Sequence, residues 1–221
     1  MTTPIRNFIF DVDGTLLDSK HDIAAAQLHV LRSLGVYDRT EEDIFPLIGK
    51  PLAEIFAILL PPPLHHCIPD AHTMYVTLYR AHALDTTRLF PGVEYTLAEL
   101  HRRGIRLAVA TTKSTMTTTR VLGHFGIAQY FVQVQGSDNL PFKPDPFIIN
   151  KIVAEQQWEK EETVMVGDTD ADIAAGKNAG VRTCGVTFGA LTRTRIEAAS
   201  PQLIIDRFDE LLRLVGDSQG S

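Results

Sequence analysis

Short apolar runs alternate with helical patterns through most of the chain after residue 90, and this alternation constrains the fold more than any other feature. The runs are apolar at nearly every position, which is typical of strands buried on both faces of a sheet. Five runs are clear and a sixth is weaker: residues 6–10, 105–110, 130–134, 163–166, 182–186 and 202–205. The helical patterns between them cover residues 93–103, 115–125, 146–158 and 171–179. This repeat predicts an α/β fold with a parallel sheet and helices on both faces.

A long interval without strand signals separates the first strand from the second. It holds roughly ninety residues, far too many for an ordinary connection within a compact domain. Helical patterns fill it, over residues 19–34, 51–60 and 69–84. We therefore expect an inserted all-helical domain of residues 17–88 and a core domain of residues 1–16 and 89–221. The two adjacent crossings are the expected hinge.

Local signals set the ends of the expected helices. Ser19 is the expected N-cap of the first inserted helix, with Asp22 at its N3 position. Pro51 is expected at the first position of the next helix, and the prolines at 61–63 end it. The tail of residues 216–221 is expected to be frayed.

Composition and charge exclude several classes of protein. The 221 residues include 27 acidic and 21 basic ones, giving a formal charge of −6 without any basic block. Nucleic acid is therefore not an expected partner. A secretory leader pattern and a membrane-spanning apolar run are both missing from the sequence, so we expect a cytoplasmic protein that does not bind membranes. Cys67 and Cys184 are expected to be reduced thiols, and the chain to be a monomer or weak homodimer.

Carboxylates gather at the ends of two predicted strands. Five aspartates share this position: Asp11 and Asp13 after the first strand, and Asp168, Asp170 and Asp172 after the run of residues 163–166. Parallel strands bring these ends to the same edge of the sheet, where ligands bind. An oxygen-only set suits Mg²⁺ better than zinc. The alternatives are an ordinary turn at Asp13 and helix N-capping by Asp168 or Asp170.

Two further strand ends carry polar groups. The run Thr111-Thr112-Lys113-Ser114 follows the second core strand, and its hydroxyls and the next helix N-terminus are suited to a phosphate. Lys143 precedes a proline-initiated helix and is a candidate charge for the same phosphate and for Asp11. The alternatives are an ordinary N-cap for the threonines and a solvated lysine.

Together these segments resemble the four motifs of the haloacid dehalogenase superfamily. The matching residues, in order, are the run of residues 11–19, then Thr111, then Lys143-Pro144, then Gly167-Asp168 with Asp172. The resemblance spans the whole chain. It implies a Rossmann-like core with a helical cap inserted just after the first strand, which agrees with the insertion expected above.

The resemblance implies a role for each aspartate. Asp11 would be the nucleophile that forms an aspartyl-phosphate. Asp13 would protonate the leaving oxygen and later deprotonate the attacking water. Mg²⁺ would be bound by Asp11, Asp168 and the backbone carbonyl of Asp13, while Asp172 would hold the metal's waters or Lys143.

The resemblance also implies which groups hold the phosphate. Thr111 and Lys143 would neutralise the transferring phosphoryl oxygens. Gly14, Thr15 and Thr112 would contribute to substrate binding. Many phosphatases of this family carry asparagine where Thr112 stands, so we expect its backbone N–H to serve instead.

Within the superfamily, Asp13 argues against the dehalogenase and phosphonatase branches, which lack an acid there. Ile23 stands where mutases carry a cap histidine. The remaining interpretation is a phosphatase. The phosphoglycolate phosphatases are the most similar, on the evidence of residues 18–23, 48–52, 186–189 and 208–212. The expected substrate is then a small phosphorylated metabolite, with Gly49 and Lys50 of the cap as candidate contacts.

Other functions stay open at this point. Pyrophosphatases, sugar-phosphate phosphatases and phosphomutases of the same superfamily share several of these segments. A phospho-acceptor or metal-binding module without turnover is a remote alternative, against which the inserted cap and Asp13 argue.

Overall fold

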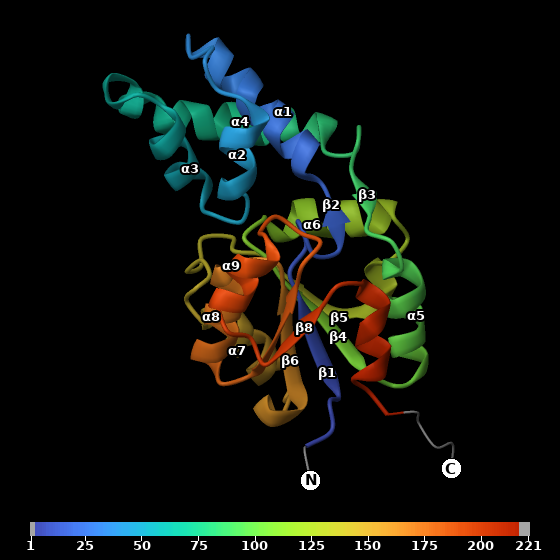
Figure 1. Ribbon diagram of the computed structural model, residues 1–221. Helices are drawn as coiled ribbons and strands as arrows, with labels where there is room; N and C mark the ends of the chain where they lie inside the picture. Colours follow the sequence, from blue (N-terminus) through green and yellow to red (C-terminus); the bar gives the residue numbers. More distant parts are fainter. Residues whose placement is uncertain (1–2, 217–221) are drawn as a thin grey trace. The chain divides into compact units, whose positions relative to one another are not determined.

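The computed structural model describes residues 3–216, so the tail expected to be frayed lies almost wholly outside the described residues. The chain forms two compact units. One runs up to Leu17 and resumes at Leu89, and the other is Asp18–Arg88. Figure 1 shows the first unit built around a sheet and the second built from helices.

The first unit is organised by a six-stranded parallel sheet with the strand order β5-β4-β1-β6-β7-β8. Its strands are β1 (Asn7–Phe10), β4 (Arg106–Ala110), β5 (Phe131–Gln135), β6 (Thr163–Gly167), β7 (Arg182–Val186) and β8 (Leu203–Ile205). β1 lies between β4 and β6, with Phe8 opposite Leu107 and Val164. The predicted α/β fold with a parallel sheet is confirmed.

Helices cover both faces of this sheet. They are α5 (Val93–Arg102), α6 (Thr115–His124), α7 (Phe147–Glu155), α8 (Asp170–Ala179) and α9 (Arg193–Ala198). Figure 1 shows α7 and α8 on one side of the sheet and α5 on the other. Successive side chains of β1 point to opposite faces of the sheet, so β1 contributes to the packing on both faces. Ile9 packs in the cluster with Ile149 and Ala175, whereas the ring of Phe10 lies 5.6 Å from that of Phe208.

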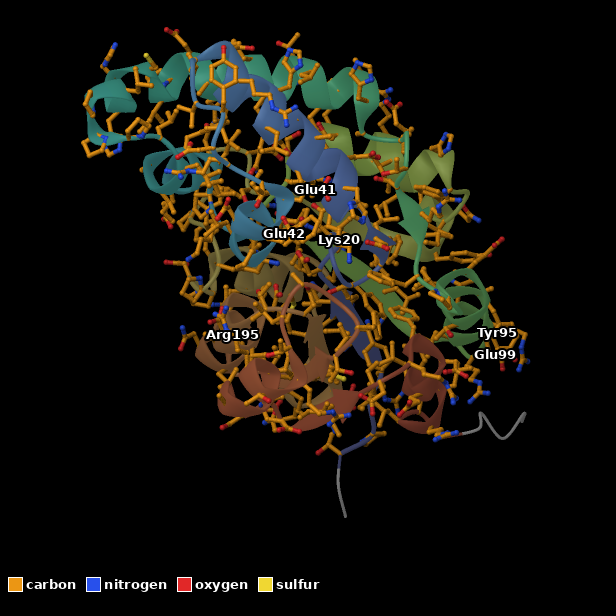
Figure 2. The ribbon with its side chains drawn as sticks, turned by 45° about the horizontal axis from the view of Figure 1, so that its top comes forward. Lys20, Glu41, Glu42, Tyr95, Glu99 and Arg195 are labelled. Carbon is orange, nitrogen blue, oxygen red and sulfur yellow. The ribbon has the colours of Figure 1, made fainter. Side chains whose placement is uncertain are left out.

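The second unit is a small helical bundle. Its helices are α1 (Lys20–Ser33), α2 (Glu41–Ile44), α3 (Leu52–Leu59) and α4 (Ile68–His82), with 3₁₀ helices at Phe45–Leu47 and Pro62–Cys67. An apolar cluster that includes Leu31, Ile55 and Phe56 forms its core. The first turn of α1 lies against α2, where His21 is hydrogen-bonded to Glu41 at 3.0 Å. Figure 2 shows Lys20, Glu41 and Glu42 at this end of the unit.

Two local expectations for the second unit are wrong, and one is confirmed. Ser19 is the N-cap residue of α1 and Asp22 its N3 residue, as predicted, although the Ser19 side chain makes no capping bond. Pro51 precedes α3 as its N-cap residue instead of occupying its first position. The insertion is also not purely helical at its ends, because β2 (Leu17–Asp18) and β3 (Arg88–Leu89) pair as a two-stranded sheet.

Asp22 ties the beginning of the insertion to its end. Its carboxylate accepts hydrogen bonds from the backbone N–H groups of Thr86 and Thr87, at 3.0 and 2.9 Å, and from both hydroxyls, at 2.6 and 2.7 Å. Burial raises the pKa of Asp22, but these hydrogen bonds outweigh it and hold the pKa below the ordinary value. The buried carboxylate is therefore a fixed structural link within the second unit.

Candidate active site

The polar groups of the candidate site follow the ends of three neighbouring strands. Asp11 follows β1 directly, Thr111 follows β4 and Asp168 follows β6. The backbone N–H of Asp11 donates to the carbonyl of Val166 at 2.9 Å, which continues the β1–β6 ladder past the end of β1. All three side chains are buried. As expected for parallel strands, their carboxyl ends bring these groups together at one edge.

The turn after β1 is shaped to fit against Asp168. Gly14 has a φ of +88°, a left-handed conformation that favours glycine. A Cβ at this position would lie 2.1 Å from Oδ2 of Asp168. Thr15 donates from its hydroxyl to Oδ1 of Asp168 at 3.0 Å, and the backbone N–H of Ala190 donates to Oδ2 at 2.7 Å. Gly14 and Thr15 thus position a carboxylate of the site.

Asp11, Asp168 and Asp172 form a buried group in which each residue offers one carboxylate oxygen, and these three oxygens lie within 4.8 Å of one another. The expected crowding of five carboxylates is wrong, because Asp170 lies outside the group. Asp170 is the first residue of α8, and it pairs at 3.1 Å with Arg195, which Figure 2 shows on the outer surface of the molecule. A cluster of three buried carboxylates is able to hold a metal ion.

N-capping does not account for Asp168 or Asp170. Thr169 is the N-cap residue of α8, and its hydroxyl accepts from the backbone N–H of Asp172 at 3.2 Å. Asp172 completes the capping box by accepting from the backbone N–H of Thr169 at 3.0 Å. The N-cap alternative for Asp168 and Asp170 is therefore wrong, since Thr169 occupies that position.

Lys143 bridges two of the three carboxylates. Its Nζ donates to Oδ1 of Asp11 at 2.6 Å, to Oδ1 of Asp172 at 2.5 Å and to the carbonyl of Ala110 at 3.1 Å. A lysine ammonium has three N–H donors, so these bonds use all of them. The structure thus places Lys143 on the carboxylates, and contact with a phosphate would require it to exchange one of these partners.

Burial and crowding shift the ionisation of the group. Burial raises the pKa of Asp11 to about 7, against the pull of Lys143 and with the help of the nearby Asp172. Burial and the charges of Asp172 and Asp11 raise the pKa of Asp168 well above its ordinary value. Burial works against the charged form of Lys143, but Asp11 and Asp172 outweigh it and raise its pKa. The single positive charge of Lys143 does not balance the negative charges of these three carboxylates.

The loop after β4 supplies hydroxyls and a second lysine. Thr111 is buried, and its hydroxyl accepts from the backbone N–H of Lys113 at 3.3 Å. Thr112 is half-buried beside it. Ser114 caps α6 by accepting from the backbone N–H of Thr117 at 3.3 Å, so the N-cap alternative applies to Ser114 and not to the threonine pair.

An ion pair that was not predicted from the sequence joins Lys113 and Asp13. Nζ of Lys113 donates to Oδ1 of Asp13 at 2.8 Å. The lysine was visible in the polar run after β4, but nothing in the sequence indicates its partner a hundred residues away. Gly49 and Lys50 lie in the second unit, in the turn before α3, and their assignment to the substrate stays a prediction.

Residues 8–186 match the family model of the haloacid dehalogenase-like hydrolases. The chain belongs to this family. It is 34% identical to a phosphoglycolate phosphatase of Vibrio parahaemolyticus, with 97% of each chain covered. It is 32% identical to the pyrophosphatase PpaX of Anoxybacillus flavithermus, over 96% of this chain and 97% of the other.

Solved structures agree with this assignment. The crystal structure of a predicted phosphoglycolate phosphatase from Haemophilus somnus has a TM-score of 0.88 and 26% identity, and the match covers 97% of this chain and 99% of the other. The predicted family and the prediction of a phosphatase are confirmed. Within residues 3–216, the structure has no helix long and apolar enough to cross a membrane.

Proposed function

We propose that this family member hydrolyses small phosphomonoesters through a phosphorylated Asp11, with 2-phosphoglycolate as its substrate. The observation that carries the proposal is the buried Asp11 carboxylate at the end of the central strand β1, held by Lys143 at 2.6 Å. Asp13, two residues further on, has its own cationic partner. Two carboxylates with separate partners are suited to two different roles.

In the first step an oxygen of Asp11 attacks phosphorus while the bond to the ester oxygen breaks. Lys143 fixes the Asp11 carboxylate through Oδ1, which leaves the other oxygen for the attack. Asp13 acts as the general acid and gives a proton to the departing oxygen. In the second step Asp13 takes a proton from the attacking water, the bond between phosphorus and Asp11 breaks, and inorganic phosphate leaves.

The residues of the site fit Mg²⁺. Carboxylates of Asp11 and Asp168, with the backbone carbonyl of Asp13, make an all-oxygen donor set of the kind Mg²⁺ prefers. Asp172 is already bonded to Lys143 and Thr169, so we assign it to holding Lys143. When bound, Mg²⁺ would neutralise the charge on the transferring phosphoryl group.

Charge balance supports the same ion. The carboxylates of Asp11, Asp13, Asp168 and Asp172 face the two ammonium groups of Lys113 and Lys143. With every group ionised, two negative charges are left over, and one divalent cation balances them.

The loop after β4 is assigned to the phosphoryl oxygens. The Thr111 hydroxyl lies at the carboxyl end of the strand next to β1, and the backbone N–H of Thr112 stands in for the asparagine that many relatives carry. Gly14 and Thr15 support the site by positioning Asp168. Gly49 and Lys50 are candidate contacts from the second unit. A cytoplasmic location and a monomeric or weakly dimeric state stay predictions.

The choice of 2-phosphoglycolate rests on the phosphoglycolate phosphatase relatives, which match almost the full chain. Pyrophosphate is the second candidate, because a pyrophosphatase is nearly as similar. Both substrates are small and carry a second anionic group beside the phosphoryl group that is transferred. The mechanism above applies to both of them.

The test is phosphate release, with Mg²⁺, from 2-phosphoglycolate, pyrophosphate, several sugar phosphates and p-nitrophenyl phosphate. We expect 2-phosphoglycolate to have the highest kcat/KM, and the Asp11→Asn variant to be inactive on all of them. A higher kcat/KM for pyrophosphate would replace the substrate but keep the mechanism. Turnover by Asp11→Asn at the wild-type rate would overturn the mechanism.

A further inference from the structure

Lys113 is a charged side chain that the mechanism does not use. Its side chain is 11% exposed, and its ammonium group lies 2.8 Å from Oδ1 of Asp13, whose side chain is 12% exposed. Asp13 is the residue assigned to the leaving oxygen of the substrate. Lys113 therefore lies next to the place where the leaving group of the substrate must be.

The loop that carries Lys113 is fixed by the segment after β5. The backbone N–H of Ser137 donates to the carbonyl of Lys113 at 3.3 Å, and the Ser137 hydroxyl donates to the carbonyl of Thr111 at 3.1 Å. Gly136 approaches so closely that a Cβ there would lie 2.4 Å from the carbonyl oxygen of Lys113. The lysine thus extends from a well-anchored backbone, which favours a defined position for its charge.

We propose that Lys113 is a specificity residue that binds a second anionic group on the leaving part of the substrate, one carbon away from the ester oxygen. This inference rests on the proposed phosphatase function and defines its substrate class as phosphoesters whose leaving group is itself an anion. The carboxylate of 2-phosphoglycolate is such a group. Lys113 would bind it while remaining close to Asp13.

Distances support this assignment. Lys113 donates to Oδ1 of Asp13, and a leaving oxygen bonded to that same oxygen would lie at most about 6 Å from the lysine ammonium. A carboxylate on the carbon next to the ester oxygen extends on the order of 3 Å from that oxygen. The remaining gap is about the length of an ion pair. A neutral alkyl leaving group would reach the same place without forming an ion pair with Lys113.

The charge of the site supports it as well. An anionic leaving group must approach a region that already holds the carboxylates of Asp11, Asp13, Asp168 and Asp172. Lys143 is bonded to two of those carboxylates and to a backbone carbonyl. Lys113 is thus the cation placed to offset the repulsion on the side of Asp13, and its loss should be felt most by anionic leaving groups.

The experiment compares 2-phosphoglycolate with its carboxamide analogue, which has the same size but no carboxylate charge. Wild-type protein should prefer 2-phosphoglycolate by at least about tenfold in kcat/KM. The Lys113→Gln variant should raise the KM for 2-phosphoglycolate by about 10- to 100-fold and change kcat/KM for the carboxamide by less than about threefold. Lys113→Arg should recover part of the preference, because it keeps the charge.

Two controls keep the result interpretable. Lys151→Gln removes a half-buried lysine of α7 that pairs with Glu155, and should leave the turnover of both substrates unaffected. Lys113→Met keeps the aliphatic part of the side chain and removes the charge, so it replaces Lys113→Gln if that variant does not fold. Circular dichroism of each variant checks the fold.

The contradicting results are distinct from each other. Equal losses on both substrates in Lys113→Gln and Lys113→Met would show that Lys113 acts only through Asp13, and would overturn the inference while the proposed function stands. A wild-type enzyme that shows no preference for the carboxylate would overturn it too. Wild-type protein that fails to hydrolyse 2-phosphoglycolate at all would instead refute the proposed substrate, and the inference with it.

Discussion

Asp11 and Asp22 are two aspartates buried to nearly the same degree, with 6% and 5% of their surface exposed, one in each unit of the chain. Asp22 accepts hydrogen bonds from the backbone N–H groups and hydroxyls of Thr86 and Thr87. Asp11 instead shares one lysine with Asp172 and faces Asp168 as a further carboxylate.

The pKa values of these two carboxyls move in opposite directions. Hydrogen bonds outweigh burial at Asp22 and lower its pKa, whereas burial dominates at Asp11 and raises its pKa to about 7. The degree of burial therefore does not distinguish a structural carboxylate from a reactive one. What distinguishes them is whether the protein alone satisfies the charge or leaves part of it for a ligand.

The largest expected difference between the two is in catalysis. Asp11→Asn should lower kcat by at least about 10³-fold, equivalent to about 4 kcal/mol, because an amide does not form the acyl phosphate. Its free energy of unfolding should change by less than about 1 kcal/mol, since asparagine still offers Lys143 an oxygen. Phosphate release and urea unfolding measure the two quantities. A folded Asp11→Asn protein with substantial turnover would contradict this assignment.

The corresponding change at Asp22 should act on stability. Asp22→Asn should lower the free energy of unfolding by about 3 kcal/mol, because the amide loses the charge and places N–H donors against the Thr86 and Thr87 donors. Urea unfolding gives the value. Asp70→Asn, at an exposed aspartate of α4, is the matched control and should cost less than about 1 kcal/mol. Equal losses of unfolding free energy in the two variants would contradict a structural role for the Asp22 carboxylate.

Mg²⁺ should stabilise the first unit only by binding at the site of Asp11 and Asp168. Mg²⁺ at a hundred times its Kd should raise the free energy of unfolding by about 2.7 kcal/mol, because it binds the folded state alone. Asp168→Asn should abolish this increase, and Asp22→Asn should keep it. Thermal unfolding with and without Mg²⁺ provides the measurement. An Mg²⁺ effect that persists in Asp168→Asn would place the ion elsewhere.

The smallest expected effect is the pH dependence of the Asp22 contribution. The pKa of Asp22 is lower in the folded protein than in the unfolded chain. The unfolded state therefore takes up the proton first as the pH falls. The contribution is complete above about pH 4 and is lost below that, as the pH falls through the lowered pKa. The stability difference between wild type and Asp22→Asn should narrow from pH 5 to pH 3. A difference that widens instead would mean that the pKa is raised.

Much of the first unit could be predicted from sequence because its signals are local. Near-continuous apolar runs mark the strands, and parallel strands put their carboxyl ends together. This is why the proximity of Asp11 and Asp168 was predictable without knowing any distance. The short helix α9 escaped prediction because it is only six residues long and has little periodicity.

Contacts that depend on the conformation of loops were not predictable. Asp22 looked like an N3 capping residue, but its partners lie 64 and 65 residues away. Asp170 follows β6 as closely as its neighbours do, but it is the first residue of α8 and faces Arg195. Lys113 finds Asp13 through a loop conformation that the segment after β5 fixes. Such pairings depend on loop geometry, for which a sequence pattern carries no period.

The central claim is that Asp11 accepts the phosphoryl group. The most direct test is to mix wild-type protein with 2-phosphoglycolate and Mg²⁺, quench with acid within one turnover, and map the added mass by peptide mass spectrometry. The account predicts one phosphoryl group on the peptide that contains Asp11, and none in Asp11→Asn treated in the same way. A phosphoryl group on another residue, or rapid turnover without any phosphorylated protein, would contradict it.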